Sequence, residues 1–136
     1  EALYLLQKED LSDVVAINAA AGDKVLVPPN YGHITINRSN KTLKMSNFVA
    51  RDFSSLYDPI KEKGGGAYFF TRDGWIKNPR CPEASELRRA DAPGGRTLSQ
   101  LGLAKGKEMY PLLKEHGRLD YLTRPGDHLD LFSGVI

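Results

Sequence analysis

The sequence predicts an all-β protein, a small β-sandwich or barrel that carries an irregular and helical C-terminal extension. Three observations support this fold class. Short strand-like runs recur with turn signals between them as far as residue 77. Two of these runs flank Arg72-Asp73-Gly74, which is typical of a tight hairpin turn. After Asn78 the chain becomes rich in proline and glycine, and the strand pattern stops.

Each expected strand rests on a short apolar or alternating run. Val14-Val-Ala-Ile17 is a continuous apolar run, whereas Ile34-Thr-Ile-Asn37 alternates apolar and polar residues as a half-buried strand does. Between the strands, Phe53–Lys63 predicts a short helix that Gly64-Gly-Gly66 ends. The expected strands are Leu3–Gln7, Val14–Asn18, Lys24–Val27, His33–Asn37, Leu43–Phe48, Ala67–Thr71 and Trp75–Lys77.

Residues 78–136 form the predicted extension, and residues 1–77 the predicted β-barrel portion. Lys107–His116 has a helical pattern in which Met109, Leu112 and Leu113 share one face, and Gly117 follows as a stop signal. Arg118–Thr123 predicts a further turn of helix, which ends before Pro125. A separate domain of this length would have a thin hydrophobic core, so we expect the extension to pack on the barrel.

Composition limits the classes of function. The chain has 136 residues, 40% hydrophobic and 26% charged, with a net charge of +2. These values are ordinary for one globular domain and give no strong field for nucleic acid or for a membrane surface. Cys81 is the single cysteine, so neither a disulfide framework nor a cysteine-based zinc site is expected. No apolar run is long enough to span a bilayer, and the N-terminal run lacks the basic start of a signal peptide, so a cytoplasmic protein is expected.

His33 is the principal candidate for chemistry. It follows the rigid Pro28-Pro29 turn and Gly32, at the start of a returning strand. A histidine held in this way can be a metal ligand or a general base, but it can equally be a packed strand residue. The other histidines are less informative, because His116 suits a helix C-terminus and His128 lies in a polar loop.

Two other kinds of chemistry lack support. No Gly-x-Ser-x-Gly motif is present, and nothing near Cys81 in the sequence activates its thiol. Gly64-Gly-Gly66 is not a phosphate loop, because no Lys-Ser/Thr follows it and a strand comes next where a helix should start.

The run from Val25 to Asn37, Val-Leu-Val-Pro-Pro-Asn-Tyr-Gly-His-Ile-Thr-Ile-Asn, resembles the second motif of the cupin superfamily. More narrowly, it resembles the cupin-type phosphoglucose isomerases best known from archaea. Tyr57–Gly64 and the run from Phe70 that ends in Asn78-Pro-Arg80 resemble the segment that follows the barrel in that family. The resemblance covers residues 1–80 and implies a cupin (jelly-roll) barrel.

The resemblance also implies site residues. By position, Glu1 matches a glutamate that is a metal ligand in the family, His33 matches a later histidine ligand, and Tyr57 matches a tyrosine of the sugar-phosphate pocket. Glu1 is also a candidate catalytic base. A second pocket tyrosine is replaced by Val49, and a histidine by Ser55. The family's His-x-His ligands lie upstream of the glutamate, so we expect the chain to be the C-terminal part of a longer isomerase.

The expected activity is the interconversion of glucose 6-phosphate and fructose 6-phosphate with one divalent metal ion: iron, manganese, nickel or zinc. A mixed nitrogen and oxygen ligand set suits all four. Another metal-dependent cupin enzyme and a non-catalytic sugar-binding cupin are the alternatives. The habit of cupins to pair their barrels, together with exposed strand edges, predicts a homodimer. Neither nucleic acid nor a membrane is an expected partner.

Overall fold

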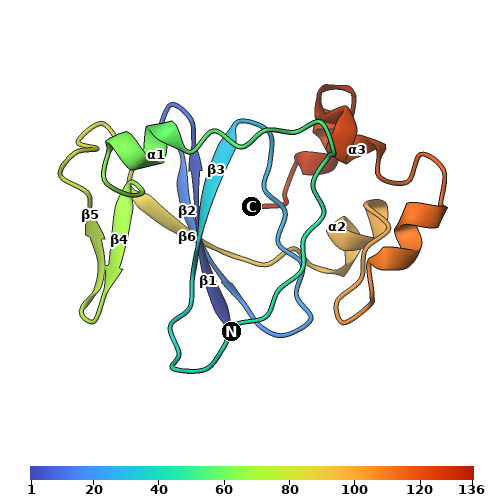
Figure 1. Cartoon of the computed structure of the whole chain (residues 1–136), viewed down its shortest axis with the longest axis horizontal. Helices are drawn as coiled ribbons and strands as arrows, with labels where there is room; N and C mark the ends of the chain where they lie inside the picture. The colour runs from blue at the N-terminus through green and yellow to red at the C-terminus, as the bar shows by residue number, and fades with distance from the viewer.

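The computed structural model describes residues 1–136 as two β-sheets followed by a helical C-terminal region (Figure 1). About 21% of the residues are helical and 24% are in strands, so the all-β class describes the first part of the chain and not the whole. The strands are β1 (Ala2–Lys8), β2 (Val14–Ala19), β3 (Tyr31–Ile36), β4 (Tyr68–Thr71), β5 (Gly74–Lys77) and β6 (Leu87–Asp91). The helices are α1 (Asp58–Glu62), α2 (Gly95–Gln100), η1 (Tyr110–Lys114), α3 (Asp120–Thr123) and η2 (Pro125–Phe132).

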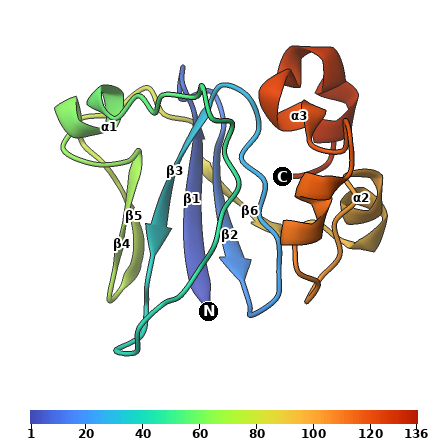
Figure 2. The ribbon, with the colours of Figure 1, turned by 45° about the vertical axis from the view of Figure 1, so that its right-hand side comes forward.

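The larger sheet has the strand order β3-β1-β2-β6. β1 is antiparallel to both of its neighbours, and β6 joins the far edge parallel to β2. Figure 2 shows these strands side by side, with the helical region beyond β2 and β6. In the pairing of β1 with β3, Leu6 is opposite His33 and Leu3 is opposite Ile36. This register decides where the candidate site residues lie.

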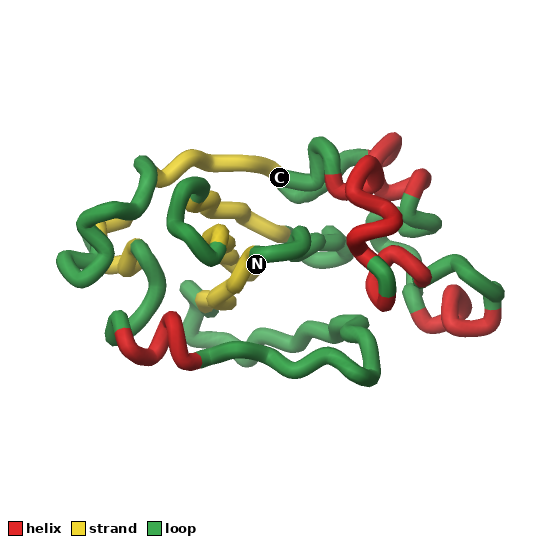
Figure 3. Tube along the Cα trace, turned by 90° about the horizontal axis from the view of Figure 1, so that it is seen from above, coloured by secondary structure: helices red, strands yellow, loops and turns green.

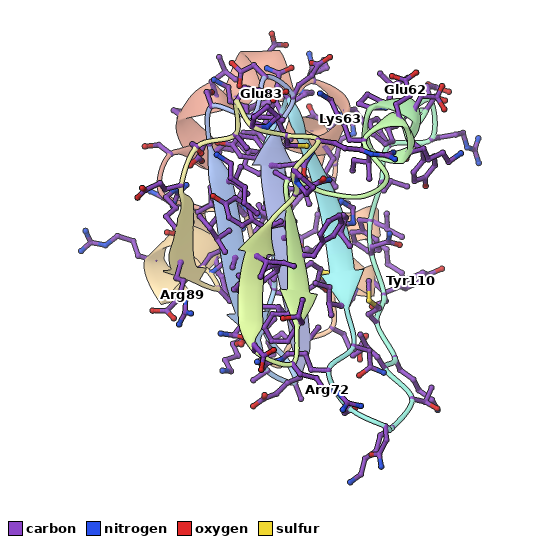
Figure 4. The ribbon with its side chains drawn as sticks, turned by 90° about the vertical axis from the view of Figure 1, so that its left-hand side faces the viewer. Glu62, Lys63, Arg72, Glu83, Arg89 and Tyr110 are labelled. Atoms are coloured by element: carbon purple, nitrogen blue, oxygen red, sulfur yellow. The ribbon has the colours of Figure 1, made fainter.

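The β4–β5 hairpin forms a second sheet that lies in front of the larger one when the molecule is viewed from its left-hand side (Figure 4). Thr71 pairs with Gly74 across a two-residue loop, and Gly74 has φ +109°, a conformation that favours glycine. The hairpin predicted at Arg72-Asp73-Gly74 is therefore confirmed. Phe70 and Trp75 pair edge to face with their ring centroids 5.1 Å apart.

Two hydrophobic clusters cover the two faces of the larger sheet. On the face toward the hairpin, Leu5 and Val14 pack with Ala67 and Cys81. On the opposite face, Leu6, Val15 and Ile17 form a separate cluster. This division follows the two-residue alternation of the strands, so adjacent residues of β1 belong to different cores.

The sheets do not close into a barrel. β4 and β5 pair only with each other, and β3 and β6 each have one neighbour within the larger sheet. The structure is therefore an open sheet with a hairpin packed on one face, and the cupin barrel, which we expected to be incomplete at its N-terminal side, stays a prediction. Closure would need hydrogen bonds between the edge strands and the hairpin, and these are not formed.

Two predicted strands are wrong. Residues 24–27 and 43–48 have no regular structure. In the first, Val25 and Leu26 belong to different hydrophobic clusters, and two prolines follow at once. In the second, the Tyr4 hydroxyl is 4.0 Å from the Met45 sulfur, so the segment crosses over the sheet instead of extending its edge. Figure 3 shows this long loop running beside the strands.

The C-terminal region is held by its own apolar cluster. Leu26, Leu98, Leu101, Leu103, Leu112, Tyr121 and Val135 make up this core. The helix predicted at Lys107–His116 is reduced to the 3₁₀ helix η1, with Pro111 in its first turn and Gly117 (φ +73°) after its end. β6 and α2 were not predicted. β6 lies within the segment assigned to the extension, yet it pairs with β2 in the main sheet.

A polar cluster joins β3 and β6 to Asp13, which directly precedes β2, on the face that carries Leu6. Arg88 of β6 donates two hydrogen bonds to the Asp13 carboxylate, from Nε (2.7 Å) and Nη2 (2.8 Å). The Tyr31 hydroxyl of β3 donates to the same carboxylate at 2.6 Å. The Arg88 hydrogen bonds lower the pKa of Asp13, and burial beside Asp13 raises the pKa of Tyr31 to about 12.

The Tyr31 pKa predicts a loss of stability at high pH. Because the folded state holds the phenol proton more tightly than the unfolded state, this contribution is complete below pH 10 and is lost as the pH rises toward 12. A shift of this size, reduced for the partial exposure of the ring, corresponds to about 1–2 kcal/mol. Urea unfolding of the wild type and of Tyr31→Phe should show this extra loss in the wild type alone.

Tyr110→Phe is the matched control for this measurement, since Tyr110 is 68% exposed. It should follow the wild type across the same pH range. If Tyr31→Phe and the wild type lose stability in parallel between pH 10 and pH 12, the hydroxyl of Tyr31 does not stabilise the fold through Asp13.

No helix of the chain combines the length and the apolar character that crossing a bilayer requires.

Candidate functional site

Glu1 and His33, the two predicted metal ligands, lie apart. Glu1 precedes β1 and its Oε2 is 3.3 Å from Nη2 of Arg38. His33 is opposite Leu6, five residues further along β1. At about 3.3 Å per residue this is a separation of roughly 17 Å along the strand. Side chains alternate between the two faces of a strand, so Glu1 lies on the face of Leu3, whereas His33 lies on the face of Leu6. The two side chains are therefore on opposite faces of the sheet.

The two residues therefore do not fit a shared metal centre in this arrangement. No group of three or more His, Cys, Asp or Glu side chains is placed to hold a metal ion. The roles of Glu1 and His33 as ligands stay predictions from the sequence. His33 is exposed, but the loss of part of its water shell lowers its pKa, which favours the neutral imidazole that a ligand or a base requires.

Tyr57, the predicted sugar-phosphate contact, lies at the end of the sheet far from Glu1. It is the N-cap of α1, it is 62% exposed, and Lys61 Nζ is 5.6 Å from its ring centroid. Ile60 of the same helix approaches Gly32, which is opposite Gln7 of β1. Figures 1 and 2 show α1 at the top of the sheet and the N-terminus at the bottom. The structure thus brings α1 toward the His33 end of the ladder and leaves Glu1 at the other end.

A small pocket lies between the larger sheet and the hairpin, on the face that carries Leu3. Its volume is about 100 Å³. The lining residues are Leu3, Ala16, Asn18, Arg38, Phe70, Gly74, Trp75 and Arg89. Arg38, the ion-pair partner of Glu1, is part of this wall, so the Glu1 carboxylate lies beside the pocket. Two guanidinium groups and no carboxylate line it.

Contacts on both sides fix the position of Arg38. Its guanidinium carbon is 5.8 Å from the centroid of Phe70, and its Nη2 is paired with Glu1. Arg89 is on β6, level with Ala16 of β2, and it takes part in none of the ion pairs of the structure. Figure 4 shows Arg89 on β6, to the side of the hairpin.

A second cavity, of about 170 Å³, lies where the C-terminal region meets the loop between β2 and β3. There the Gly106 amide donates to the Gly22 carbonyl (2.8 Å), and Lys105 pairs with Asp23 at 2.7 Å. These contacts attach the C-terminal region to the sheet. Because the cavity contains none of the predicted site residues, we assign it no role.

The wall of this pocket combines two arginines with two aromatic residues, and arginine side chains suit carboxylate and phosphate groups. The family model of glucose-6-phosphate isomerase (GPI) matches residues 1–85, more than half of the 136 residues, and the chain belongs to this family. The resemblance predicted over residues 1–80 is thus confirmed. No curated protein and no solved structure matches the chain.

Sequence reasoning missed Asn18, Arg38, Trp75 and Arg89 as site residues. Arg38 directly follows the strand expected at His33–Asn37, and Trp75 was expected only as a strand residue. Arg89 lies on a strand that was not predicted. The one signal in the sequence was the adjacent pair Arg88-Arg89, whose side chains point to opposite faces of an edge strand.

Proposed function

We propose that this protein acts in the isomerisation of glucose 6-phosphate to fructose 6-phosphate, with Glu1 as the base that moves the proton. The match of residues 1–85 to the glucose-6-phosphate isomerase family is the observation that carries the proposal. The position of Glu1 supports it, since the carboxylate lies at the edge of a pocket whose cationic walls suit a phosphorylated sugar.

The proposed reaction is a proton transfer between neighbouring carbons. Glu1 removes the proton from C2 of the open-chain aldose, the electrons of that bond form the C1–C2 double bond of an enediol, and the carbonyl oxygen at C1 takes a proton from solvent water. Glu1 then returns its proton to C1 while the C2 hydroxyl gives its proton back to solvent water, which leaves the ketose. No other group is consumed in this sequence.

Several features stay predictions within this proposal. A divalent metal ion held in part by His33, a pocket contact from Tyr57, a cupin barrel, a homodimer and a cytoplasmic location all follow from the sequence and from the resemblance. Glu1 and His33 lie on opposite faces of the sheet. For this reason we assign the proton transfer to Glu1 alone and give no step of it to a metal ion.

A coupled assay of fructose 6-phosphate conversion tests the proposal. We expect turnover of the phosphorylated sugar and none of fructose. Absence of turnover under all metal conditions would contradict the proposed reaction. Activity that a chelator removes and a single metal ion restores would support the metal prediction, whereas undiminished turnover in His33→Ala would contradict the role of His33 as a ligand.

The second candidate, a non-catalytic protein that binds sugar phosphates, is favoured by the separation of Glu1 from His33. Tight binding of fructose 6-phosphate without turnover would select this candidate over the isomerase.

A further inference from the structure

We propose that residues 20–27 of the β2–β3 loop and residues 95–136 form one cooperative unit that opens away from the larger sheet while the sheet stays folded. We call this unit the cover, because in its closed position it lies over the face of the sheet that carries Leu6. Residues 95–136 lie outside the residues that the family model matches, so the match assigns them no role. The movement is independent of the proposed reaction.

The core of the cover is separate from the cores of the sheet. Leu26 of the β2–β3 loop is its one buried member from the first part of the chain, and the other buried members come from the C-terminal region. No strand contributes a buried side chain to it. Figure 2 shows the C-terminal region to one side of the strands. A group of residues that buries its apolar side chains mainly against one another can open as a unit, at a lower free energy than global unfolding.

Three contacts join the loop to the C-terminal region within the cover. The Gly106 amide donates to the Gly22 carbonyl (2.8 Å), and Lys105 Nζ is 2.7 Å from Oδ1 of Asp23. Leu26 is 8% exposed and packs in the core of the C-terminal region. The loop has no strand pairing at these positions. Its conformation therefore depends on the C-terminal region, so the two parts should open together.

The hold of the cover on the sheet is small. Of its side chains, Val25 of the loop and Ile136 at the C-terminus pack against the cluster of Leu6, Val15 and Ile17, and both are only partly buried. Ile136 also packs against the core of the cover, so it connects the two clusters. Opening the cover removes Val25 and Ile136 from this cluster and makes that face of the sheet accessible.

The connections at the ends of the cover allow the movement. Gly94 and Gly95 join β6 to the C-terminal region, both are exposed, and the position of a side chain at either residue faces open space. Glycine adopts a wide range of backbone conformations, so this pair is suited to act as a hinge. Pro28 and Pro29 follow the loop part of the cover and have no backbone N–H with which to pair. The face that opening exposes also carries His33.

Hydrogen exchange of the full chain, measured by NMR, tests the cover in the wild type. The amides of Leu101, Leu103 and Leu112 are hydrogen-bonded and belong to buried residues of its core. We expect these three amides to share one protection factor, at least about 10-fold below that of the β1 amides. Equal protection of β1 and the cover would overturn the proposal, because the chain would then open only as a whole.

Gly22→Ala tests whether the loop and the C-terminal region open together. A Cβ at Gly22 would lie 3.1 Å from Cα of Gly106, and Gly22 has φ +86°, so the substitution strains the loop and pushes it from the C-terminal region. We expect the protection of Leu101 and Leu103 to fall about 10- to 100-fold while that of β1 stays unchanged. Gly74→Ala is the matched control, since Gly74 has φ +109° but open space around it in the hairpin; the cover should exchange as in the wild type.

Ile136→Ala tests the hold on the sheet, and it keeps the test decisive if Gly22→Ala fails to fold. We expect about 10-fold lower protection of Leu101 and Leu103, again without a change in β1. Leu129→Ala is the control, because Leu129 is an apolar residue of the same region that is 62% exposed. A loss of protection that is equal in β1 and the cover, or one in Gly22→Ala that stays within the β2–β3 loop, would contradict the cover. Neither reading requires turnover, so the isomerase assay can fail or succeed independently.

Discussion

Glu1→Gln is expected to lower kcat for fructose 6-phosphate conversion by about 10²- to 10⁴-fold, the usual contribution of a positioned acid–base group. The amide has the size of the carboxylate but cannot accept the substrate proton. Because the substitution removes only the proton acceptor, KM should stay close to that of the wild type. A loss in kcat without a rise in KM is the pattern of an interaction needed in the transition state.

Glu9→Gln is the matched control, because Glu9 is an exposed glutamate in the turn between β1 and β2; its kcat should equal that of the wild type. Glucose 6-phosphate carrying deuterium at C2, assayed in the direction of fructose 6-phosphate, adds a second measurement. Since the Glu1 side chain is 73% exposed, a proton held there exchanges with water. Deuterium should therefore appear in the solvent. Its full retention at C1 of the product would contradict proton transfer through Glu1.

The strands that sequence analysis found are those whose pattern is local. Leu3–Gln7, Val14–Asn18 and the hairpin around Asp73 show alternation, apolar runs or a turn signal within a few residues, and the structure contains them. β6 could not be found in this way. Leu87-Arg-Arg-Ala-Asp91 has charged residues on both faces, and its pairing with β2 depends on a partner about 70 residues away in the chain.

The candidate site depended on register, which the sequence does not reveal. Glu1 and His33 were expected to belong to one metal site because the resemblance assigns both as ligands. One-residue differences in pairing decide which face a side chain points to. Here the pairing of Leu6 with His33 separates the two residues. The same pairing places Arg38 beside Glu1, at the end of β1 that Glu1 precedes. No local motif in the sequence indicates this contact.

Asn78→Ala is expected to destabilise the fold by about 2–4 kcal/mol, because it leaves one buried and two partly buried backbone groups without partners. Asn78 is 1% exposed. Its Nδ2 donates to the carbonyls of Gly66 (2.8 Å) and Lys63 (3.1 Å), and its Oδ1 accepts from the Arg80 amide (2.9 Å). One side chain thus connects the end of β5 to the chain that enters β4. Urea unfolding would measure this loss of stability. Asn40→Ala is the control, because Asn40 is exposed, and its free energy of unfolding should be within about 0.5 kcal/mol of the wild type.

Asn78→Asp distinguishes hydrogen bonding from the simple filling of space. The carboxylate has the size of the amide, yet at neutral pH it turns an oxygen toward two carbonyl oxygens and is buried without a cation. We therefore expect Asn78→Asp to be at least as unstable as Asn78→Ala at pH 7, and to recover part of its stability in acid, where the protonated group can donate. Equal stability of Asn78→Asp and the wild type at pH 7 would contradict this account. The Asn78-Pro-Arg80 segment, which resembles the segment after the barrel in the family, would then need a role other than holding the hairpin on the sheet.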